Sequence, residues 1–405
     1  MSVSPFKSTG ARLFMASVLG FLAAMGPLCT DFYLPALPDM AAELGSAPSQ
    51  MQLSITACLL GLSLGQIVLG PLSDARGRKW PLLVSLAVFI VASFLCSRAS
   101  SVGELIALRF IQGLAGSGGV VLSRAIACDL FRGTELTKFF SLLMLINGVA
   151  PIFGPVIGGQ ILRFSSWGGI FVFLAVCGAA QFSLVLFGCP ETLPADRRIQ
   201  GGMGQSVRAM LRLFENRTFL CYMLIQGFVM AGFFGYISAS PFVLQNLYGL
   251  SAQQYALCFG LNGIGIMLFA QITGRVCMAY GDRTVLGAGV ALSLIASLGI
   301  VVVSVLHLPV PFMIGSLFLF VSCIGITTTT SFSLAIAAQT EGAGSASGLL
   351  GVTSFVFGAA ASPLVGLGGD STSLPMAVVA VISGLLVLLF FRMAARTRRE
   401  AKRSE

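Results

Sequence analysis

Residues 50–79 read QMQLSITACLLGLSLGQIVLGPLSDARGRK, a long apolar run that ends in a short polar turn with several basic residues. A helix needs about 20 apolar residues to cross a membrane, and residues 50–72 provide that length before Asp74. Lys and Arg beside a span are typical of its cytoplasmic end. This stretch therefore predicts a membrane-spanning helix whose C-terminal end, near Arg76 and Arg78, faces the cytoplasm.

The composition of the 405-residue chain excludes an ordinary soluble protein. Hydrophobic residues make up 56% of the chain and charged residues 10%, whereas soluble domains carry about 45–50% apolar and about 25% charged residues. The mean hydropathy is +0.93, and the 48 glycines suit helices that pack closely in a membrane. The chain is therefore predicted to be a polytopic membrane protein.

Apolar runs of spanning length recur twelve times along the chain. They cover residues 13–37, 50–72, 80–98, 103–126, 136–162, 167–188, 218–245, 252–278, 285–306, 309–332, 344–366 and 373–393. The first run is longer than the apolar core of a signal peptide, and it carries Asp31 and Tyr33 near its end. We predict an all-α fold with twelve transmembrane helices.

The basic residues predict how these spans are oriented. With both termini in the cytoplasm, 21 of the 24 Lys and Arg residues fall in cytoplasmic segments. Only Arg98 and Arg163 fall outside, and Arg109 lies within a span. The net charge of +9 is therefore an orientation signal, and we expect the lipid bilayer, not nucleic acid, as the partner.

The side chains that carry most enzyme chemistry form no recognisable pattern. The ten Cys residues are scattered singly, and His307 is the only histidine. We interpret the cysteines as small apolar packing residues, and we expect no metal site and no cofactor. The P-loop pattern G-x-x-x-x-G-K-[ST] is absent from the sequence. These features argue against an enzyme or an ATP-driven pump.

The longest loop divides the chain into six spans plus six. We predict an N-terminal half at 1–188, a cytoplasmic linker at 189–216, a C-terminal half at 217–393 and a basic cytoplasmic tail at 394–405. Segments 45–70 and 249–274 share a Ser/Gln helix start and a mid-span glycine. Such repeats predict two pseudo-symmetric halves with a substrate site near the membrane midplane between them.

Five motifs resemble those of the major facilitator superfamily. They are the loop signature GPLSDARGRK (70–79), the intramembrane arginine motif LRFIQGLAGS (108–117), APIFGPVIGG (150–159), PETLP (190–194) and TDFYLPALPDM (30–40). The third motif is similar to that of the proton-driven drug antiporter branch, and the last to the bicyclomycin/chloramphenicol-resistance type. The resemblance covers essentially the whole chain and implies the major facilitator fold.

The resemblance implies a gate at the cytoplasmic end of span two. Its residues here are Gly70, Asp74, Gly77, Arg78, Lys79 and Asp129. In this family an arginine at the position of Arg78 pairs with an acid at the position of Asp129, and the pair latches one conformation of the transporter. The alternative is that Arg78 and Lys79 only anchor the topology.

The segment 150–159 carries the antiporter motif residues Gly154, Pro155, Gly158 and Gly159. Proline removes a helix hydrogen bond and kinks the span, while glycine lets another helix approach closely. The resemblance implies a role in antiport. Ordinary glycine-mediated packing is the alternative.

Embedded charges are the strongest functional signal, because ionisable residues inside a membrane are costly and rare. Asp31 and Arg109 lie in the outer halves of spans one and four, and we predict that they couple protons to transport. Asp31 could instead cap the end of span one, and Arg109 could be a structural hydrogen-bond hub.

Substrate contacts are predicted from polar and aromatic residues within the spans, since ligand sites combine apolar walls with a few polar groups. The candidates are Asp31, Tyr33, Gln112, Asn147, Gln226, Phe233, Tyr236 and Asn262. Many phenylalanines in such a chain face lipid or other helices instead.

These features predict a proton-coupled antiporter that exports drugs or small amphipathic molecules by alternating access. The partners are a small-molecule substrate and protons, the proton gradient is the energy source, and we expect a monomer. The location is the bacterial inner membrane, with both termini cytoplasmic. Exporters of a specific metabolite, such as an amino acid or nucleoside, and importers with the same fold remain alternatives.

Overall fold

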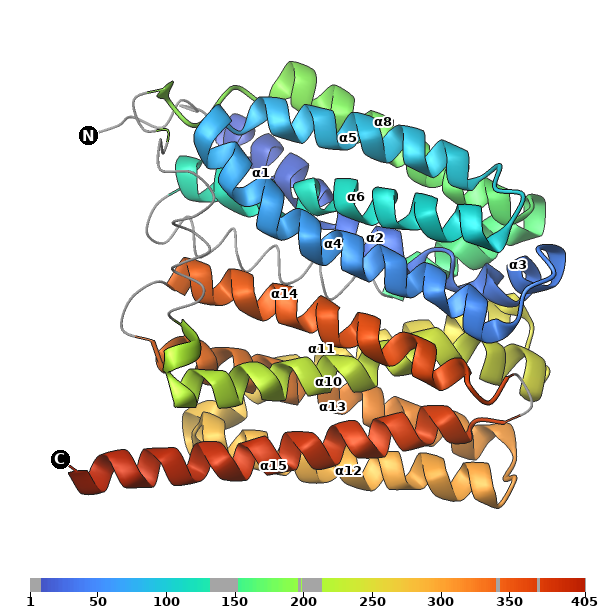
Figure 1. Cartoon of the computed structure of the whole chain (residues 1–405), viewed down its shortest axis with the longest axis vertical. Coiled ribbons are helices and arrows are strands. Elements are labelled where there is room, and N and C mark those ends of the chain that lie inside the picture. The colour runs from blue at the N-terminus through green and yellow to red at the C-terminus, as the bar shows by residue number, and fades with distance from the viewer. Residues whose placement is uncertain are drawn as a thin grey trace. The chain divides into compact units, whose positions relative to one another are not determined.

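Figure 1 shows the computed structural model of the chain, which describes residues 9–131, 152–195, 198, 213–339, 343–369 and 372–404. Every regular element over these residues is helical. Eleven of the helices are long and apolar enough to cross a membrane. A shorter apolar helix, Ile152–Phe164, is the described part of the fifth predicted span. The predicted all-α polytopic fold is confirmed.

The chain separates into two compact units, which we describe one at a time. The first unit comprises Met1–Tyr33 and Ala57–Gln205. Its helices are α1 (Thr9–Ala23), α2 (Met25–Asp31), most of α4 (Pro48–Arg76), α5 (Lys79–Cys96), α6 (Val102–Leu130), Ile152–Phe164 and α8 (Trp167–Gly188). Helix α5 packs against both α6 and α8, and α1 packs against α6.

The second unit comprises Leu34–Thr56 and Ser206–Glu405. It holds η1 (Leu34–Ala36), α3 (Leu37–Glu43), η3 (Leu213–Glu215), α10 (Arg217–Phe242), η4 (Val243–Leu247), α11 (Ala252–Tyr280), α12 (Asp282–Val305), α13 (Val310–Ala337), α14 (Ala343–Ala361), η5 (Ser362–Gly366) and α15 (Leu374–Ser404). Helix α10 packs against α13, α14 and α15, and α12 packs against α13 and α15 (Figure 1). Leu34–Thr56 therefore packs with the second unit, although its place in the sequence is among the first six spans.

Span one is interrupted where the sequence suggested a single run. Helix α1 ends at Ala23, α2 ends at Asp31, and a short 3₁₀ turn leads into α3. Proline lacks a backbone N–H and disfavours the helical conformation in the residue before it. Pro27, Pro35 and Pro38 lie along this stretch. The break makes Asp31 the last residue of α2, at a helix end inside the protein.

Glycines bring helices together in the same way in both units. A Cβ built on Gly65 of α4 would lie 2.9 Å from Cβ of Ser117 on α6, and one on Gly265 of α11 would lie 3.2 Å from Cβ of Ser322 on α13. In each half, the second span thus contacts the fourth through a glycine and a serine. The faint repeat in the sequence corresponds to a repeated mode of packing.

The contact between α4 and α6 yields a stability test at Gly61. A Cβ on Gly61 would lie 2.7 Å from the backbone nitrogen of Leu114, so Gly61→Ala forces the two backbones apart. Overpacking of this kind costs about 1–3 kcal/mol, and we expect a lower midpoint of thermal unfolding in detergent. Gly315→Ala is the matched control, because a Cβ on Gly315 meets nothing within 4 Å. Equal midpoints for the two variants would contradict this account of the packing.

Candidate functional site

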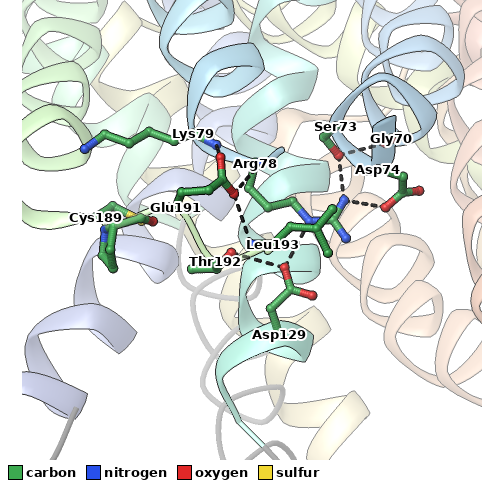
Figure 2. A network of polar contacts seen from close by, with 11 residues as sticks. Gly70, Ser73, Asp74, Arg78, Lys79, Asp129, Cys189, Glu191, Thr192 and Leu193 are labelled. Carbon is green, nitrogen blue, oxygen red and sulfur yellow. Dashed lines mark hydrogen bonds and ion pairs between the residues drawn. The ribbon is translucent and has the colours of Figure 1, made fainter. Parts of the chain in front are cut away.

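The first cluster of functional residues surrounds Arg78, at the turn between α4 and α5 (Figure 2). The Arg78 guanidinium donates to Asp74 Oδ1 at 2.5 Å and to Asp129 Oδ2 at 3.0 Å. It also donates to Ser73 Oγ at 2.7 Å. The Arg78 side chain is only 10% exposed, so these ion pairs are partly shielded from water. Burial opposes the charge, but the carboxylates of Asp129 and Asp74 raise the pKa of Arg78 above its ordinary value.

The structure thus brings together Asp74, Arg78 and Asp129, which the loop signature and the family resemblance singled out. The Gly70 carbonyl accepts from Ser73 Oγ at 2.7 Å, so Gly70 supports the hydroxyl that receives Arg78. Lys79 lies differently: its ammonium donates to the carbonyl of Leu186 in α8 at 2.9 Å. The gating role of these residues stays a prediction.

Glu191 is a central member of this cluster that the sequence analysis left out of the site. Its carboxylate accepts from the backbone N–H groups of Arg78 at 2.8 Å, Leu193 at 3.0 Å and Lys79 at 3.2 Å. The first N–H groups of a helix have no partner within it, and a carboxylate there is favourable. Glu191 therefore caps the start of α5 from the segment that follows α8 (Figure 2).

The bonding of Glu191 affects its own ionisation. Burial alone would raise the pKa of Glu191, but the N–H groups of Leu193, Arg78 and Lys79, with the guanidinium of Arg198, hold that pKa below its ordinary value of 4.5. Next to Glu191, Thr192 Oγ1 donates to Asp129 Oδ2 at 3.1 Å. The PETLP segment therefore contacts both α5 and the end of α6. An acid just after a span, on the same expected membrane side as the loop signature, was the available signal in the sequence.

Gly77 makes room for this arrangement. Its φ of +93° lies in the region that favours glycine. A Cβ on Gly77 would also lie 2.9 Å from Cδ of Glu191. Any larger residue would therefore strain the turn and displace the Glu191 carboxylate.

The second cluster surrounds Arg109, whose side chain is fully buried in α6. Its guanidinium donates to the carbonyl of Cys29 at 2.6 Å and to the side-chain oxygen of Gln112. It also lies 4.1 Å from the ring centre of Tyr33, a cation–π contact. Gln112 in turn donates to Ser93 Oγ at 2.7 Å. Three of the predicted residues, Arg109, Gln112 and Tyr33, thus form one network.

Asp31 lies apart from that network. It is 4% exposed, and within the described residues its carboxylate has a single hydrogen bond, from Thr30 Oγ1 at 2.6 Å. No ion pair joins Asp31 to Arg109 in this part of the chain. The two residues that we predicted to couple protons to transport are therefore both buried, but no ion pair joins them within the described residues; their role in proton coupling stays a prediction.

The antiporter motif packs beside Asp31. A Cβ on Gly154 would lie 3.2 Å from Cβ of Asp31, and a Cβ on Gly158 would meet the carbonyl of Phe32. Pro155 and Gly159 are buried in the same helix, Ile152–Phe164. The small residues of this motif therefore allow close approach to the end of α2, where the carboxylate is held.

The remaining substrate candidates lie in the second unit, apart from Asn147, which is outside the described residues. Asn262 of α11 donates to the hydroxyl of Tyr236 of α10 at 2.8 Å, and the Tyr236 ring stacks on Phe233 at 6.3 Å. Gln226 of α10 accepts from Ser331 Oγ of α13 at 2.7 Å. Each of these polar side chains links neighbouring helices. One atom, Asn262 Oδ1, is buried without a partner among the described residues.

Membrane-crossing helices in two repeated halves, with ionisable groups buried inside them, define a secondary transporter. The chain belongs to the Major Facilitator Superfamily, whose family profile matches residues 14–363.

Individual relatives agree with this assignment. The chain is 41% identical over 382 residues to the MFS-type transporter YdgK of Bacillus subtilis (strain 168), covering 94% of this chain and 95% of that protein. It is 31% identical to a bicyclomycin resistance protein homolog of Haemophilus influenzae, covering 88% and 90% of the two chains. In fold it is similar to a bacterial homolog of the lysosomal transporter Spinster, with a TM-score of 0.78 and 13% identity over 96% of this chain and 98% of that one. The identification of the superfamily from the motifs is confirmed.

The capping of α5 by Glu191 predicts a pH-dependent stability. A carboxyl whose pKa is lowered in the folded state stabilises it above its unfolded value of 4.5, and that stabilisation is lost as the pH falls through the folded pKa. We expect Glu191→Gln to lower the midpoint of thermal unfolding at pH 7 and to flatten its decline below about pH 4.5, the ordinary value.

Glu104→Gln is the control. Glu104 bonds to Ser100 at the N-terminal end of α6, whereas the Arg78 cluster contacts the C-terminal end of that helix through Asp129. The control should leave initial transport rates unchanged, whereas Glu191→Gln should alter them by loosening the Arg78 cluster. Identical transport rates and pH profiles for wild type and Glu191→Gln would contradict the role assigned to Glu191.

Proposed function

We propose that the protein is a proton-coupled antiporter that exports drugs or small amphipathic molecules from the bacterial cytoplasm by alternating access. The observation that carries the proposal is Asp31, a buried carboxyl group that has one hydrogen bond and no paired cation among the residues that the structure describes. Support also comes from relatives that are named for bicyclomycin, chloramphenicol and multidrug resistance.

The coupling follows from the free energy of a buried charge. An ionised carboxylate inside a membrane protein is costly unless a cation or several hydrogen-bond donors compensate it. Asp31 has neither among the described residues, so it exchanges between a protonated form and a form that a substrate group stabilises. Proton and substrate then bind in turn, as antiport requires.

Arg109 serves this mechanism by holding the surrounding helices in place. It joins α6 to the carbonyl of Cys29 in α2, two residues before Asp31. Tyr33, just after Asp31, lies against the same guanidinium. We propose that Arg109 positions both sides of the Asp31 segment, and that Tyr33 and Gln112 contribute to the substrate path.

The Arg78 cluster acts as the latch of the transport cycle in this proposal. Each partly exposed ion pair is worth about 0–1 kcal/mol, but two carboxylates and the Glu191 cap act together. Their sum suffices to bias two conformations that differ by a few kcal/mol. The distribution of basic residues supports a position of this cluster and of both chain termini on the cytoplasmic side of the inner membrane.

A screen for exported compounds tests the proposed function. The chain is expressed in a bacterial host that lacks its main efflux pumps, and susceptibility to antibiotics and metabolites is measured with and without a protonophore. We expect at least one compound to be tolerated at several-fold higher concentration, and the protonophore to abolish that tolerance. Tolerance that persists in the presence of the protonophore would argue against proton coupling.

Replacing Asp31 tests the coupling itself. In proteoliposomes, Asp31→Asn should bind the exported compound yet release no protons when the compound is added, because the amide does not ionise. Asp39→Asn is the matched control, since Asp39 is exposed on α3. Proton release equal to that of wild type in Asp31→Asn would remove Asp31 from the mechanism.

A further inference from the structure

Arg124 of α6 is a cation without a partner among the described residues, and the proposed mechanism does not use it. No hydrogen bond or ion pair joins its guanidinium to another residue in the described part of the chain. Two described arginines in or beside α6 have partners: Arg78 is held by two carboxylates, and Arg109 by a carbonyl, an amide and a ring. Arg124 is partly buried, so it is not a freely hydrated surface charge either.

The position of Arg124 along α6 is close to the cytoplasmic end. It precedes the last helical residue, Leu130, by six positions, or about 9 Å at the rise of an α-helix. Asp129, near that end, belongs to the Arg78 cluster. An arginine at this depth lies where a solute entering from the cytoplasm passes from water into the bundle.

Contacts of α6 show which way Arg124 faces. Ser117 lies beside Gly65 of α4, and Val120 lies beside Gly26 of α2, where a built Cβ would be 3.3 Å from the valine. Residues of an α-helix advance by about 100° each. Arg124 therefore points about 20° from the direction of Ser117 and about 40° from that of Val120, between the two.

This direction leads into the space between the α1–α2 segment and α4, because a Cβ on Gly119 already meets the carbonyl of Leu22 in α1, and away from the side that contacts α5. The α5 side is marked by Ser85, whose hydroxyl donates to the carbonyl of Ala115 at 2.5 Å. Arginine at the edge of a membrane can extend toward lipid headgroups. A guanidinium directed between two helices of its own bundle is better placed to meet a solute.

We propose that Arg124 binds the acidic group of the exported solute as it enters from the cytoplasm, and that the substrates include molecules with a carboxylate. The inference rests on the proposed function and narrows it to a substrate class. A guanidinium presents two parallel N–H donors that match the two oxygens of a carboxylate. The carboxylate of the solute then supplies the negative charge opposite Arg124, which the described residues do not provide.

The charges then act in sequence along the path. Arg124 attracts an acidic group near the cytoplasmic end, whereas Asp31 lies deeper and accepts either a proton or a basic or polar group. A zwitterionic molecule satisfies both residues. A molecule without an acidic group gains nothing from Arg124, which makes Arg124 a determinant of specificity.

The test uses two probes that differ only in the acidic group: a fluoroquinolone carboxylic acid and its methyl ester. Initial rates of export are measured over a range of concentrations in vesicles that contain wild type, Arg124→Gln or Arg124→Lys. We expect Arg124→Gln to raise the KM for the acid about tenfold, equivalent to about 1.4 kcal/mol, and to leave the ester unchanged. Arg124→Lys should lie between, because it keeps the charge but loses the two-donor geometry.

Arg163→Gln is the control, since Arg163 is an exposed arginine at the end of another helix. Thermal unfolding of each variant checks that the fold is intact. The proposal is wrong if wild type does not move the acid, or if Arg124→Gln affects acid and ester equally.

A lipid headgroup offers the same oxyanion chemistry, so each measurement is made in phosphatidylcholine vesicles and in vesicles with added phosphatidylglycerol. An effect of Arg124→Gln that occurs only with phosphatidylglycerol would assign the arginine to lipid and overturn the proposal. Proton-driven export of the ester serves as a check on the proposed antiport itself. If the ester is exported but Arg124 plays no part in binding the acid, only the proposal for Arg124 fails; if the ester is not exported either, the proposed antiport fails.

Discussion

The ion pairs of the Arg78 guanidinium hold together the end of the first unit where α4 and α6 finish and α5 begins. The guanidinium draws α4 and α6 together through Asp74 and Asp129, while the start of α5 is held by Glu191 from the segment after α8. Each contact is modest when exposed to water, but the side chain is largely shielded. In the proposed transport cycle these four parts of the chain move together or separate together, which is the behaviour that a two-state transporter needs.

Buried charge is treated in three different ways within the same unit. Arg109 is compensated by a backbone carbonyl, an amide and an aromatic ring, so it can stay ionised and serve the structure. Asp31 has one hydrogen bond, and Arg124 has none among the described residues. Because an uncompensated charge in a membrane protein is costly, the proposals assign a proton to Asp31 and an acidic ligand to Arg124.

The sequence predicted the helices better than it predicted the contacts between them. Apolar length located the spans, and the loop signature together with the family resemblance pointed to Arg78 and Asp129, which the structure pairs. Glu191 was missed because its role depends on where the segment after α8 folds back. The interruption of span one was missed because the span was predicted from apolar length alone, although Pro27, Pro35 and Pro38 mark where α2, η1 and α3 divide it.

Hydrophobic runs, the placement of basic residues and a few motifs were sufficient to establish a polytopic helical membrane protein of a known superfamily, since these properties belong to short stretches of chain. Only the tertiary structure decided that Asp31 and Arg109 are buried without an ion pair between them, that Gly154 packs against Asp31, and that Arg124 has no partner in the described part of the chain. Those facts depend on how helices distant in sequence turn toward one another. A rotation of about 100° separates one residue's direction from the next, and only packing selects among those directions.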